Sequence, residues 1–310
     1  MNIGFIGLGK MGKNMVLHAL EQGIEVVAWN RSQEPLKEVS NAGAIAAKNI
    51  QDLVSKLESP KLVILMLPAG DVTDEFIIEL KKYVEPNDLI VDAANSFYKD
   101  TLRRAEDLNK QGIHFMDMGT SGGPGGARGG ACLMIGGSDE DYQRLKPIAE
   151  KLAAPGAFQH LGPVGAGHFA KMVHNGIEYG MMQALAEGIA VLKKAQFNFD
   201  LIQVMDLYNH QSVITSRLVG WMKDALSKEP NLDNISSMIG SGGGGNIRIP
   251  GEADWTVQAA KEMGIDTPVI EESIRAREES WKVEESSSNG FRNKAVSAMR
   301  GEFGKHAVTK

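Results

Sequence analysis

The first twelve residues hold the feature that most restricts the fold of this chain. Residues 2–7 form a short apolar run that leads directly into Gly7-Leu8-Gly9-Lys10-Met11-Gly12. When G-x-G-x-x-G joins a strand to a helix, the first glycine permits the tight turn, the second admits a pyrophosphate and the third lets helix and strand pack closely. A helix predicted over 11–22, its stop at Gly23 and a second strand over 25–29 complete the unit. The pattern predicts a Rossmann fold that binds a dinucleotide through residues 7–12.

The residues after the second predicted strand indicate which dinucleotide binds. An acidic residue there would bind the ribose 2′-hydroxyl of NAD and repel the 2′-phosphate of NADP. This chain has Asn30, Arg31 and Ser32 instead. Asn30 removes the repulsion, Arg31 can stack on adenine and pair with the phosphate, and Ser32 can donate to it. NADP is therefore favoured over NAD; the alternative is an ordinary surface turn in which Ser32 caps the next helix.

Further apolar runs predict the rest of a doubly wound, mostly parallel sheet, and we place this domain at residues 1–163. Strands are predicted over 61–67, 88–92, 114–118 and 131–135, with helices over 71–84, 99–111 and 139–154. Ligands of such sheets lie at the carboxyl ends of the strands, so we expect Leu67, Pro68 and Ala69 to contact the cofactor. Asn95 and Ser96 follow another strand and are candidates to bind nicotinamide or substrate, with capping of the next helix as their alternative role.

A glycine-rich segment lies between the last two predicted strands of this domain. Residues 120–130 include six glycines. Such a segment is either a slack linker or a backbone cradle for an anion. Strand sequence on both sides argues against a slack linker, and the position at a strand end suits a substrate carboxylate.

From residue 164 to residue 310 the apolar residues recur mainly with helical period, which predicts a helical second domain. The predicted helices cover 167–196, 200–209, 215–227, 255–264, 267–281 and 291–303. On the first of these, one face carries Lys171, His174, Asn175 and Glu178. Apolar neighbours, among them Ile177 and Met181, indicate a buried helix, where such a polar stripe is costly without a function. The alternative is a solvated face with a Lys/Glu pair.

Composition excludes several classes of protein. The formal net charge of −6, without a basic block, makes nucleic acid and anionic membrane unlikely partners. Cys132 is the single cysteine, so no intrachain disulfide can form; we expect a buried thiol and a reducing, cytoplasmic location. No apolar run approaches ~20 residues, which argues against a membrane span. The histidines form no cluster with cysteines, so no metal site is predicted.

Together these motifs resemble the 6-phosphogluconate dehydrogenase (decarboxylating) family in its shorter-chain form, within the β-hydroxyacid dehydrogenase superfamily. The resemblance covers essentially the whole chain and rests on Gly7-Leu8-Gly9-Lys10-Met11-Gly12, Asn95-Ser96, Ser121-Gly122-Gly123, Lys171-x-x-His174-Asn175-Gly176-Ile177-Glu178-Tyr179, Trp255-Thr256, and residues 300–306. The most specific part is the stretch from His174 to Tyr179. The wider superfamily shares the lysine but usually has a second asparagine where His174 stands.

The resemblance implies an enzyme that uses NADP or NAD, and no metal, to oxidise the C3 hydroxyl of 6-phosphogluconate. Loss of CO₂ then gives ribulose 5-phosphate, for the pentose phosphate pathway or gluconate utilisation. It makes Lys171 the general base that later polarises the keto group, and Glu178 the acid that protonates the enediol carbon, with Asn175 as the third catalytic residue. The substrate-binding residues that it implies are Asn95, Ser121, Gly122, Gly123, Lys171, His174, Asn175, Glu178, Tyr179, Thr256, Arg277, Arg300 and His306.

The phosphate end carries one departure from the family pattern. Arg300 and His306 match a tail that in the family reaches into the partner subunit's site, which implies a homodimer or a higher oligomer. Where many relatives have a basic residue before the Trp-Thr pair, this chain has Asp254. A carboxylate would repel a phosphate, so Asp254 must point elsewhere or the phosphate site is altered.

Two other functions remain as alternatives. The first is a β-hydroxyacid dehydrogenase or imine reductase that acts on another small 3-hydroxy acid. Asp254 favours this alternative, and His174 with Arg300 and His306 argues against it. The second is a regulatory nucleotide-binding protein on the same fold. A regulatory protein has no need of the set formed by Lys171, Asn175 and Glu178.

Overall fold

The structure is a computed structural model that describes residues 2–240, 250–305 and 308. Its internal contacts divide the chain into two compact units, Met1–Met172 and Val173–Lys310. This boundary lies inside helix α8 (Ala166–Lys194), later than the boundary predicted after residue 163. The reason is a contact with the sheet: the buried carboxylate of Asp117 accepts hydrogen bonds from the backbone N–H groups of Gly165 and His168, each at 2.6 Å. The start of α8 thus belongs to the first unit.

The first unit is built on an eight-stranded sheet with the order β3-β2-β1-β4-β5-β6-β7-β8. Its strands are β1 (Ile3–Ile6), β2 (Val26–Trp29), β3 (Ile45–Ala46), β4 (Leu62–Leu65), β5 (Leu89–Asp92), β6 (His114–Ser121), β7 (Ala131–Gly136) and β8 (Ala153–Gly162). Neighbouring strands run parallel except β6 and β7. This order confirms the predicted doubly wound sheet. The chain reverses its direction of growth between β1 and β4, which is where ligands of such sheets bind.

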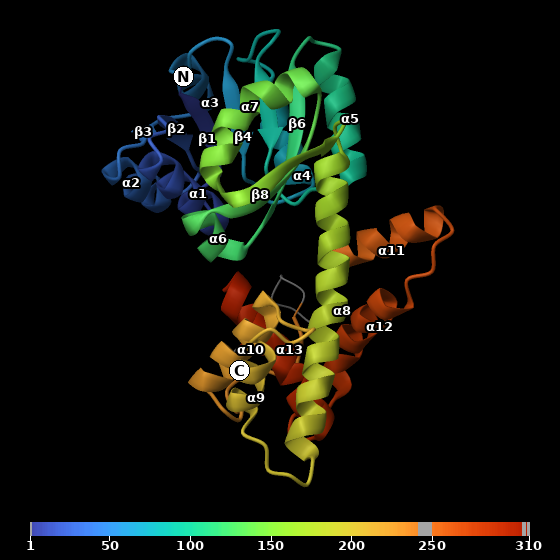
Figure 1. Cartoon of the computed structure of the whole chain (residues 1–310). Coiled ribbons are helices and arrows are strands. Elements are labelled where there is room, and N and C mark those ends of the chain that lie inside the picture. The colour runs from blue at the N-terminus through green and yellow to red at the C-terminus, as the bar shows by residue number, and fades with distance from the viewer. Residues whose placement is uncertain (1, 241–249, 306–307, 309–310) are drawn as a thin grey trace. The chain divides into compact units, whose positions relative to one another are not determined.

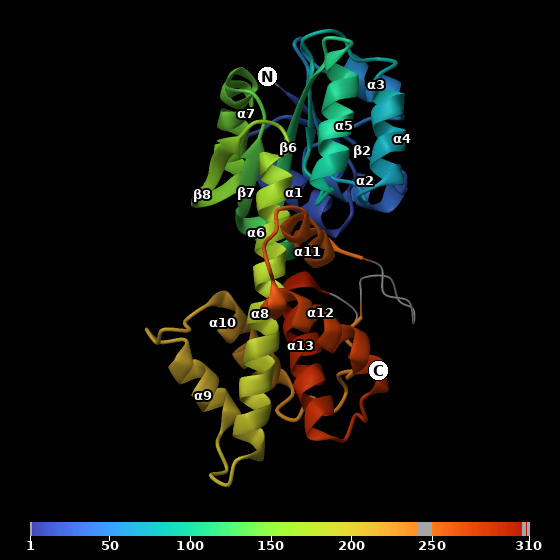
Figure 2. The same ribbon diagram turned by 90° about the vertical axis from the view of Figure 1, so that its right-hand side faces the viewer.

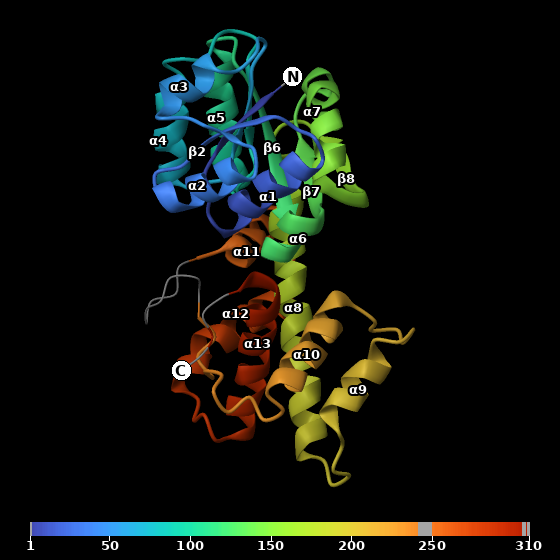
Figure 3. The ribbon, with the colours of Figure 1, turned by 90° about the vertical axis from the view of Figure 1, so that its left-hand side faces the viewer.

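Helices cover both faces of this sheet. They are α1 (Lys10–Glu21), α2 (Gln33–Asn41), α3 (Ile50–Ser55), α4 (Asp71–Leu80), α5 (Tyr98–Asn109), α6 (Gly123–Gly129) and α7 (Asp139–Leu152). One core forms between the sheet and α1, α2 and α7, and a second core forms with α3, α4 and α5 on the opposite face (Figures 2 and 3). Because both faces are covered, β4 is buried at every position, as its continuous apolar sequence predicts.

Three features of the first unit differ from expectation. The glycine-rich segment is neither a linker nor an open loop, because residues 123–129 form α6, with Pro124 in its first turn. Residues 153–162 form an additional edge strand, β8, beside β7. Cys132 is exposed rather than buried. It lies on β7, where Ala131 and Leu133 face the core and the residue between them must face away.

The second unit is helical in its described residues, as predicted. After α8 it contains α9 (Leu201–Tyr208), α10 (Arg217–Lys228), α11 (Glu252–Glu262), α12 (Pro268–Glu279), a short 3₁₀ helix (Ser280–Lys282) and α13 (Ser288–Gly304). Its core lies where α9, α10 and α13 pack beside α8 (Figure 1). Ile177 and Met181 of α8, expected to be buried, are 53% and 42% exposed in the single chain. None of the helices in the described residues has the length and apolar content of a membrane-spanning helix.

Candidate active site

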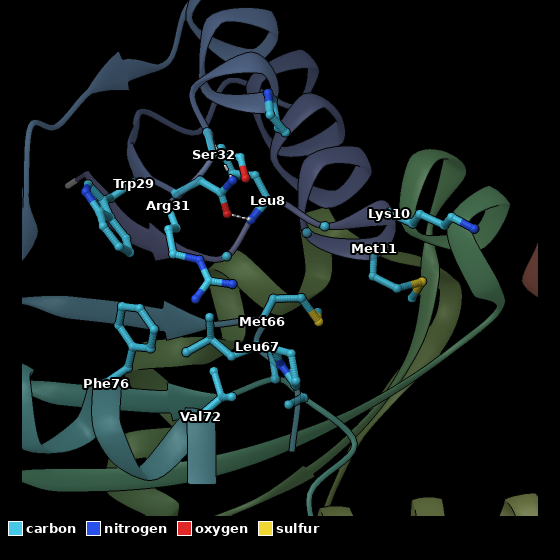
Figure 4. Close-up of a pocket in the computed structure, with 18 of the residues that line it drawn as sticks. Leu8, Lys10, Met11, Trp29, Arg31, Ser32, Met66, Leu67, Val72 and Phe76 are labelled. Atoms are coloured by element: carbon cyan, nitrogen blue, oxygen red, sulfur yellow. Dashed lines mark hydrogen bonds between the residues drawn. The ribbon is translucent and has the colours of Figure 1, made fainter. Parts of the chain in front are cut away.

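A pocket of about 570 Å³ lies at the carboxyl ends of the central strands of the first unit (Figure 4). Every residue that the sequence assigned to the cofactor lines it except Ala69. Sequence reasoning missed the remaining lining residues, which are Trp29, Pro35, Met66, Val72, Phe76, Ala93, Ala94 and Thr120. Val72 and Phe76 are one turn apart on α4, so helical periodicity after the β4 loop could have indicated them.

The glycines of the first turn have three different environments. Gly7 has a φ of +100°, a conformation that favours glycine. A Cβ on Gly12 would lie 1.9 Å from the carbonyl oxygen of Gly7, so this position allows no side chain. A Cβ on Gly9 would meet nothing within 4 Å. Gly9 is also the N-cap of α1. No side chain caps the N-terminus of α1, and the first turn of this helix holds no acidic residue. This helix end is therefore open to an anion such as a pyrophosphate.

The end of β2 is joined to the glycine turn through Asn30. Its Oδ1 accepts a hydrogen bond from the Leu8 backbone N–H at 2.9 Å, and its Nδ2 donates to the Ser32 carbonyl at 3.0 Å. Arg31 extends into the pocket toward Leu67 (Figure 4). Ser32 is the N-cap of α2 but makes no side-chain capping bond, so the alternative role that the sequence left open is not formed. None of the described residues that line the pocket is acidic.

Asn95 marks the other end of this pocket. Its Oδ1 is buried, and among the described residues it has no hydrogen-bond partner. A buried amide oxygen without a partner is costly, and the carboxamide N–H of a nicotinamide would satisfy it. With the open helix end at Gly9, this acceptor makes the pocket fit a nicotinamide dinucleotide.

Lys171 lies on the part of α8 that packs on β6. The residue is 4% exposed. A Cβ on Gly119 would come within 2.5 Å of the Lys171 Cβ, so the absence of a side chain at Gly119 is what lets the lysine approach the strand. The same strand ends at Ser121, the first residue of the expected substrate loop. Burial raises the pKa of Asp117, which holds the start of α8 on this strand.

In the second unit, the polar residues of α8 form a connected network. The Asn175 Nδ2 donates to Oε2 of Glu252 at 2.6 Å, and the Asn175 Oδ1 lies 2.8 Å from Nδ1 of His174. The Glu178 carboxylate is 3.9 Å from the same ring nitrogen. Sequence reasoning missed Glu252, which comes from α11 and is distant in the chain. In the part of the chain that the structure describes, no group of three or more His, Cys, Asp or Glu residues is placed to hold a metal.

Two buried arginines stand beside this network. The Arg277 guanidinium lies 3.3 Å from the ring centroid of Tyr179, and Arg277 and Arg300 are 5% and 7% exposed. Burial lowers the pKa of Arg300, while Tyr179 and Glu178 of the same chain favour its charged form. Arg300 lies on α13, a helix that contributes to the core of the second unit. Thr256 is also buried, and His306 lies outside the described residues.

Asp254 is the residue at which the sequence departs from the family pattern. Its carboxylate turns back to the start of α11 and accepts a hydrogen bond from the Gly251 backbone N–H at 2.8 Å. This is the N-terminal end of the helix, where a negative charge is favourable. Of the two options that the sequence left open, the geometry agrees with a carboxylate that points elsewhere.

Comparison with known proteins covers both units. Residues 2–165 match the NAD binding domain of 6-phosphogluconate dehydrogenase, and residues 167–309 match the C-terminal domain of 6-phosphogluconate dehydrogenase. A relative named as an NAD(+)-dependent, decarboxylating 6-phosphogluconate dehydrogenase, from Haloferax volcanii, is 36% identical over 100% of this chain and 99% of its own length. YqeC of Bacillus subtilis is 38% identical over the full length of both chains. The 6-phosphogluconate dehydrogenase of Plasmodium falciparum has a solved structure, described with its cofactor NADP⁺. It superimposes on this chain with a TM-score of 0.80 and is 29% identical, and the match covers 96% of this chain and 70% of the Plasmodium chain.

Proposed function

Because the chain belongs to the 6-phosphogluconate dehydrogenase family of NAD(P)-dependent decarboxylating oxidoreductases, we propose that it converts 6-phosphogluconate to ribulose 5-phosphate and CO₂. One observation carries the assignment of the chemistry to particular residues. A buried lysine, Lys171, lies on the same helix as Asn175 and Glu178, one and two turns further on. This set supplies a base, an amide and an acid without a metal ion.

The proposed proton transfers follow the order of the reaction. Lys171 takes the proton of the C3 hydroxyl as the hydride leaves C3 for the nicotinamide, which is the chemistry that the bound cofactor supplies. The protonated Lys171 then donates a hydrogen bond to the new keto oxygen. The bond between C1 and C2 breaks and CO₂ leaves. The electron pair of that bond forms a double bond between C2 and C3, and Lys171 gives its proton to the C3 oxygen, which yields the enediol. Glu178 gives a proton to the former C2 while Lys171 takes back the proton of the C3 hydroxyl, which leaves the keto group of ribulose 5-phosphate.

We propose that the substrate's two ends are held by different groups. Asn95 and the Ser121-Gly122-Gly123 loop would bind the carboxylate end, and His174 with Asn175 would bind the hydroxyls. Tyr179, Thr256, Arg277 and Arg300 would bind the phosphate, with His306 assigned by the resemblance alone. The support for the phosphate site is that the second unit holds two buried guanidinium groups, those of Arg277 and Arg300, and a guanidinium matches a phosphate in charge and geometry.

We propose NADP as the preferred cofactor. The names of relatives do not decide this, because one is called NAD-dependent and another was solved with NADP⁺. The support comes from the end of β2, where Arg31 extends into the pocket and no acidic residue lines it among those described. A guanidinium can pair with a 2′-phosphate, and a carboxylate at this position would repel it.

We further propose a homodimer, which acts in the cytoplasm on this phosphorylated sugar acid. The support for association is an apolar surface on α8, where Ile177, Met181 and Val191 are 53%, 42% and 70% exposed. Light scattering tests it: the mass of a single chain, 33.5 kDa, would contradict the dimer. The support for a reducing compartment is the single cysteine.

The activity is tested by following both products in one reaction. The purified protein is mixed with 6-phosphogluconate and either NADP⁺ or NAD⁺, and reduced nicotinamide and CO₂ are measured together. We expect equal amounts of the two, with a faster rate for NADP⁺. Reduced nicotinamide without CO₂, or turnover only with another 3-hydroxy acid, would instead identify a non-decarboxylating β-hydroxyacid dehydrogenase.

A further inference from the structure

Arg104 of α5 is a buried arginine that the proposed chemistry does not use. Its side chain is 1% exposed. Nε donates to Oδ1 of Asp74 at 2.6 Å, and Nη1 donates to Oδ2 of Asp92 and to Oγ of Ser96, each at 3.1 Å. Nη2 donates to the Gly70 carbonyl oxygen at 3.0 Å. All three nitrogens of one guanidinium therefore donate hydrogen bonds. Nε and Nη2 reach the start of α4, and Nη1 reaches the end of β5 and the loop after it.

Two of these parts are loops of the cofactor pocket. Gly70 closes the loop after β4, whose residues Leu67 and Pro68 line the pocket. Ser96 belongs to the loop after β5, where its neighbour Asn95 also lines the pocket. Arg104 thus joins the loops that follow two adjacent strands, behind the surface that the cofactor would touch.

The loop after β5 is tied to Arg104 a second time, through Asp92. This carboxylate is fully buried. Its Oδ1 accepts a hydrogen bond from the Ala94 backbone N–H at 3.1 Å, and its Oδ2 accepts one from the Ser96 hydroxyl at 2.8 Å. Both chain neighbours of Asn95 are therefore bound to Asp92, which is bound to Arg104.

Stability alone does not explain such an arrangement. A buried ion pair can often be replaced by apolar residues without loss of stability, because the desolvation of the two charges offsets their attraction. What an arginine offers beyond charge is a planar, rigid set of donors that fixes the directions of its partners. Two of the partners of Arg104 are Asp92 and Ser96, which hold the backbone on either side of Asn95. The Oδ1 of Asn95 is buried and has no donor among the described residues.

We propose that Arg104 is a positioning residue that fixes the loop carrying Asn95 against the loop after β4, and so places Asn95 for the nicotinamide end of the cofactor. The catalytic part of this inference rests on the proposed function; the binding part rests only on the pocket. The adenosine end would lie at the glycine turn and the end of β2, whereas the hydrogen bonds of Arg104 go to the start of α4, the end of β5 and Ser96. Loss of Arg104 should therefore weaken binding of the whole dinucleotide more than binding of its adenosine half.

The test measures the binding of two ligands by calorimetry. The first is whichever dinucleotide, NADP⁺ or NAD⁺, the wild type binds more tightly. The second is the adenosine fragment of that dinucleotide, which is 2′,5′-ADP for NADP⁺ and ADP for NAD⁺. For Arg104→Met we expect the Kd of the dinucleotide to rise about tenfold and the Kd of the fragment to stay within about twofold. Turnover of 6-phosphogluconate should fall by about 10- to 100-fold, as expected for a misplaced reacting group. Two outcomes would overturn the proposal: both ligands weakened equally, or neither weakened.

Ser96→Ala is the second variant, because Arg104→Met leaves Asp92 buried without its cation and can fail to fold. Ser96→Ala removes the bonds to Asp92 and Arg104 from one side of Asn95 and leaves the ion pairs in place. Its binding of the dinucleotide should also weaken more than its binding of the fragment, but by a smaller factor than in Arg104→Met.

The matched control is Arg103→Met, since Arg103 also pairs with Asp74, at 2.7 Å, but its side chain is 57% exposed. Unchanged binding is expected for it. If wild type binds the dinucleotide but does not turn over 6-phosphogluconate, the binding comparison still decides the proposal.

Discussion

Replacement of Gly9 by alanine separates cofactor binding from folding more cleanly than any other change in the glycine turn. Gly9 has a φ of −65° and a ψ of −170°, which alanine adopts without strain. An added Cβ meets no atom within 4 Å, so the protein itself has room for it. That room is the space above the N-terminus of α1, where we place the pyrophosphate.

The two effects of Gly9→Ala differ in size. Alanine is a poorer N-cap than glycine, which should cost less than about 1 kcal/mol in the free energy of unfolding. The methyl group would push the phosphate away from the N–H groups of α1. Loss of one charge-assisted hydrogen bond costs about 1.5–3 kcal/mol. Because about 1.4 kcal/mol corresponds to a tenfold change in affinity, the Kd for NADP⁺ should rise by about 10- to 150-fold.

Calorimetric titration with NADP⁺ and thermal unfolding measure both effects, with Gly12→Ala as the control. A Cβ on Gly12 would lie 1.9 Å from the Gly7 carbonyl oxygen, so α1 must shift, at a cost of about 1–3 kcal/mol or more. We expect Gly12→Ala to lower the Tm clearly and Gly9→Ala to leave it within about 4 °C of wild type. An unchanged Kd in Gly9→Ala would refute the placement of the pyrophosphate over this residue.

Three further substitutions test the catalytic base, the cofactor preference and the phosphate site. Lys171→Met should lower turnover by at least about 100-fold with little change in the Kd for NADP⁺. The control Lys194→Met, at the exposed end of the same helix, should match wild type. Comparable turnover in the two variants would remove Lys171 from the mechanism. Asn30→Asp keeps an acceptor for the Leu8 N–H but adds a negative charge near the 2′-phosphate. The ratio of kcat/KM for NADP⁺ to kcat/KM for NAD⁺ should therefore fall about tenfold or more. A constant ratio would show that this residue does not select the cofactor. Arg277→Met should raise the KM for 6-phosphogluconate by about 10-fold or more, because a charge-assisted bond to phosphate is lost; an unchanged KM would place the phosphate elsewhere.

The sequence was most informative where function and fold depend on residues that are close together in the chain. The glycine turn, the apolar strands and the polar stripe on α8 are local patterns, and each was read correctly as strand, turn or helix. Most residues that line the pocket followed from them, because parallel strands bring their carboxyl ends to one edge of the sheet. The family resemblance rested on the same short motifs.

Details of local conformation were harder to predict even within these motifs. The segment from Gly123 to Gly129 is a helix, although glycine favours helices least among residues other than proline. Cys132 is exposed because of the register of β7, and the sequence around it does not reveal which face of the strand is covered. In both cases the surrounding fold overrides what the residue types alone suggest.

By itself the sequence determined the Rossmann order of elements, the glycine turn at the pocket and the helix that carries Lys171, because hydrophobic period and glycine spacing encode local structure. Only the tertiary structure decided which distant side chains meet. Glu252 reaches Asn175 across 77 residues, and Arg104 reaches the Gly70 carbonyl across 34. Neither contact leaves a periodic trace in the sequence, since a hydrogen bond between two elements depends on how those elements pack and not on the residues beside either partner.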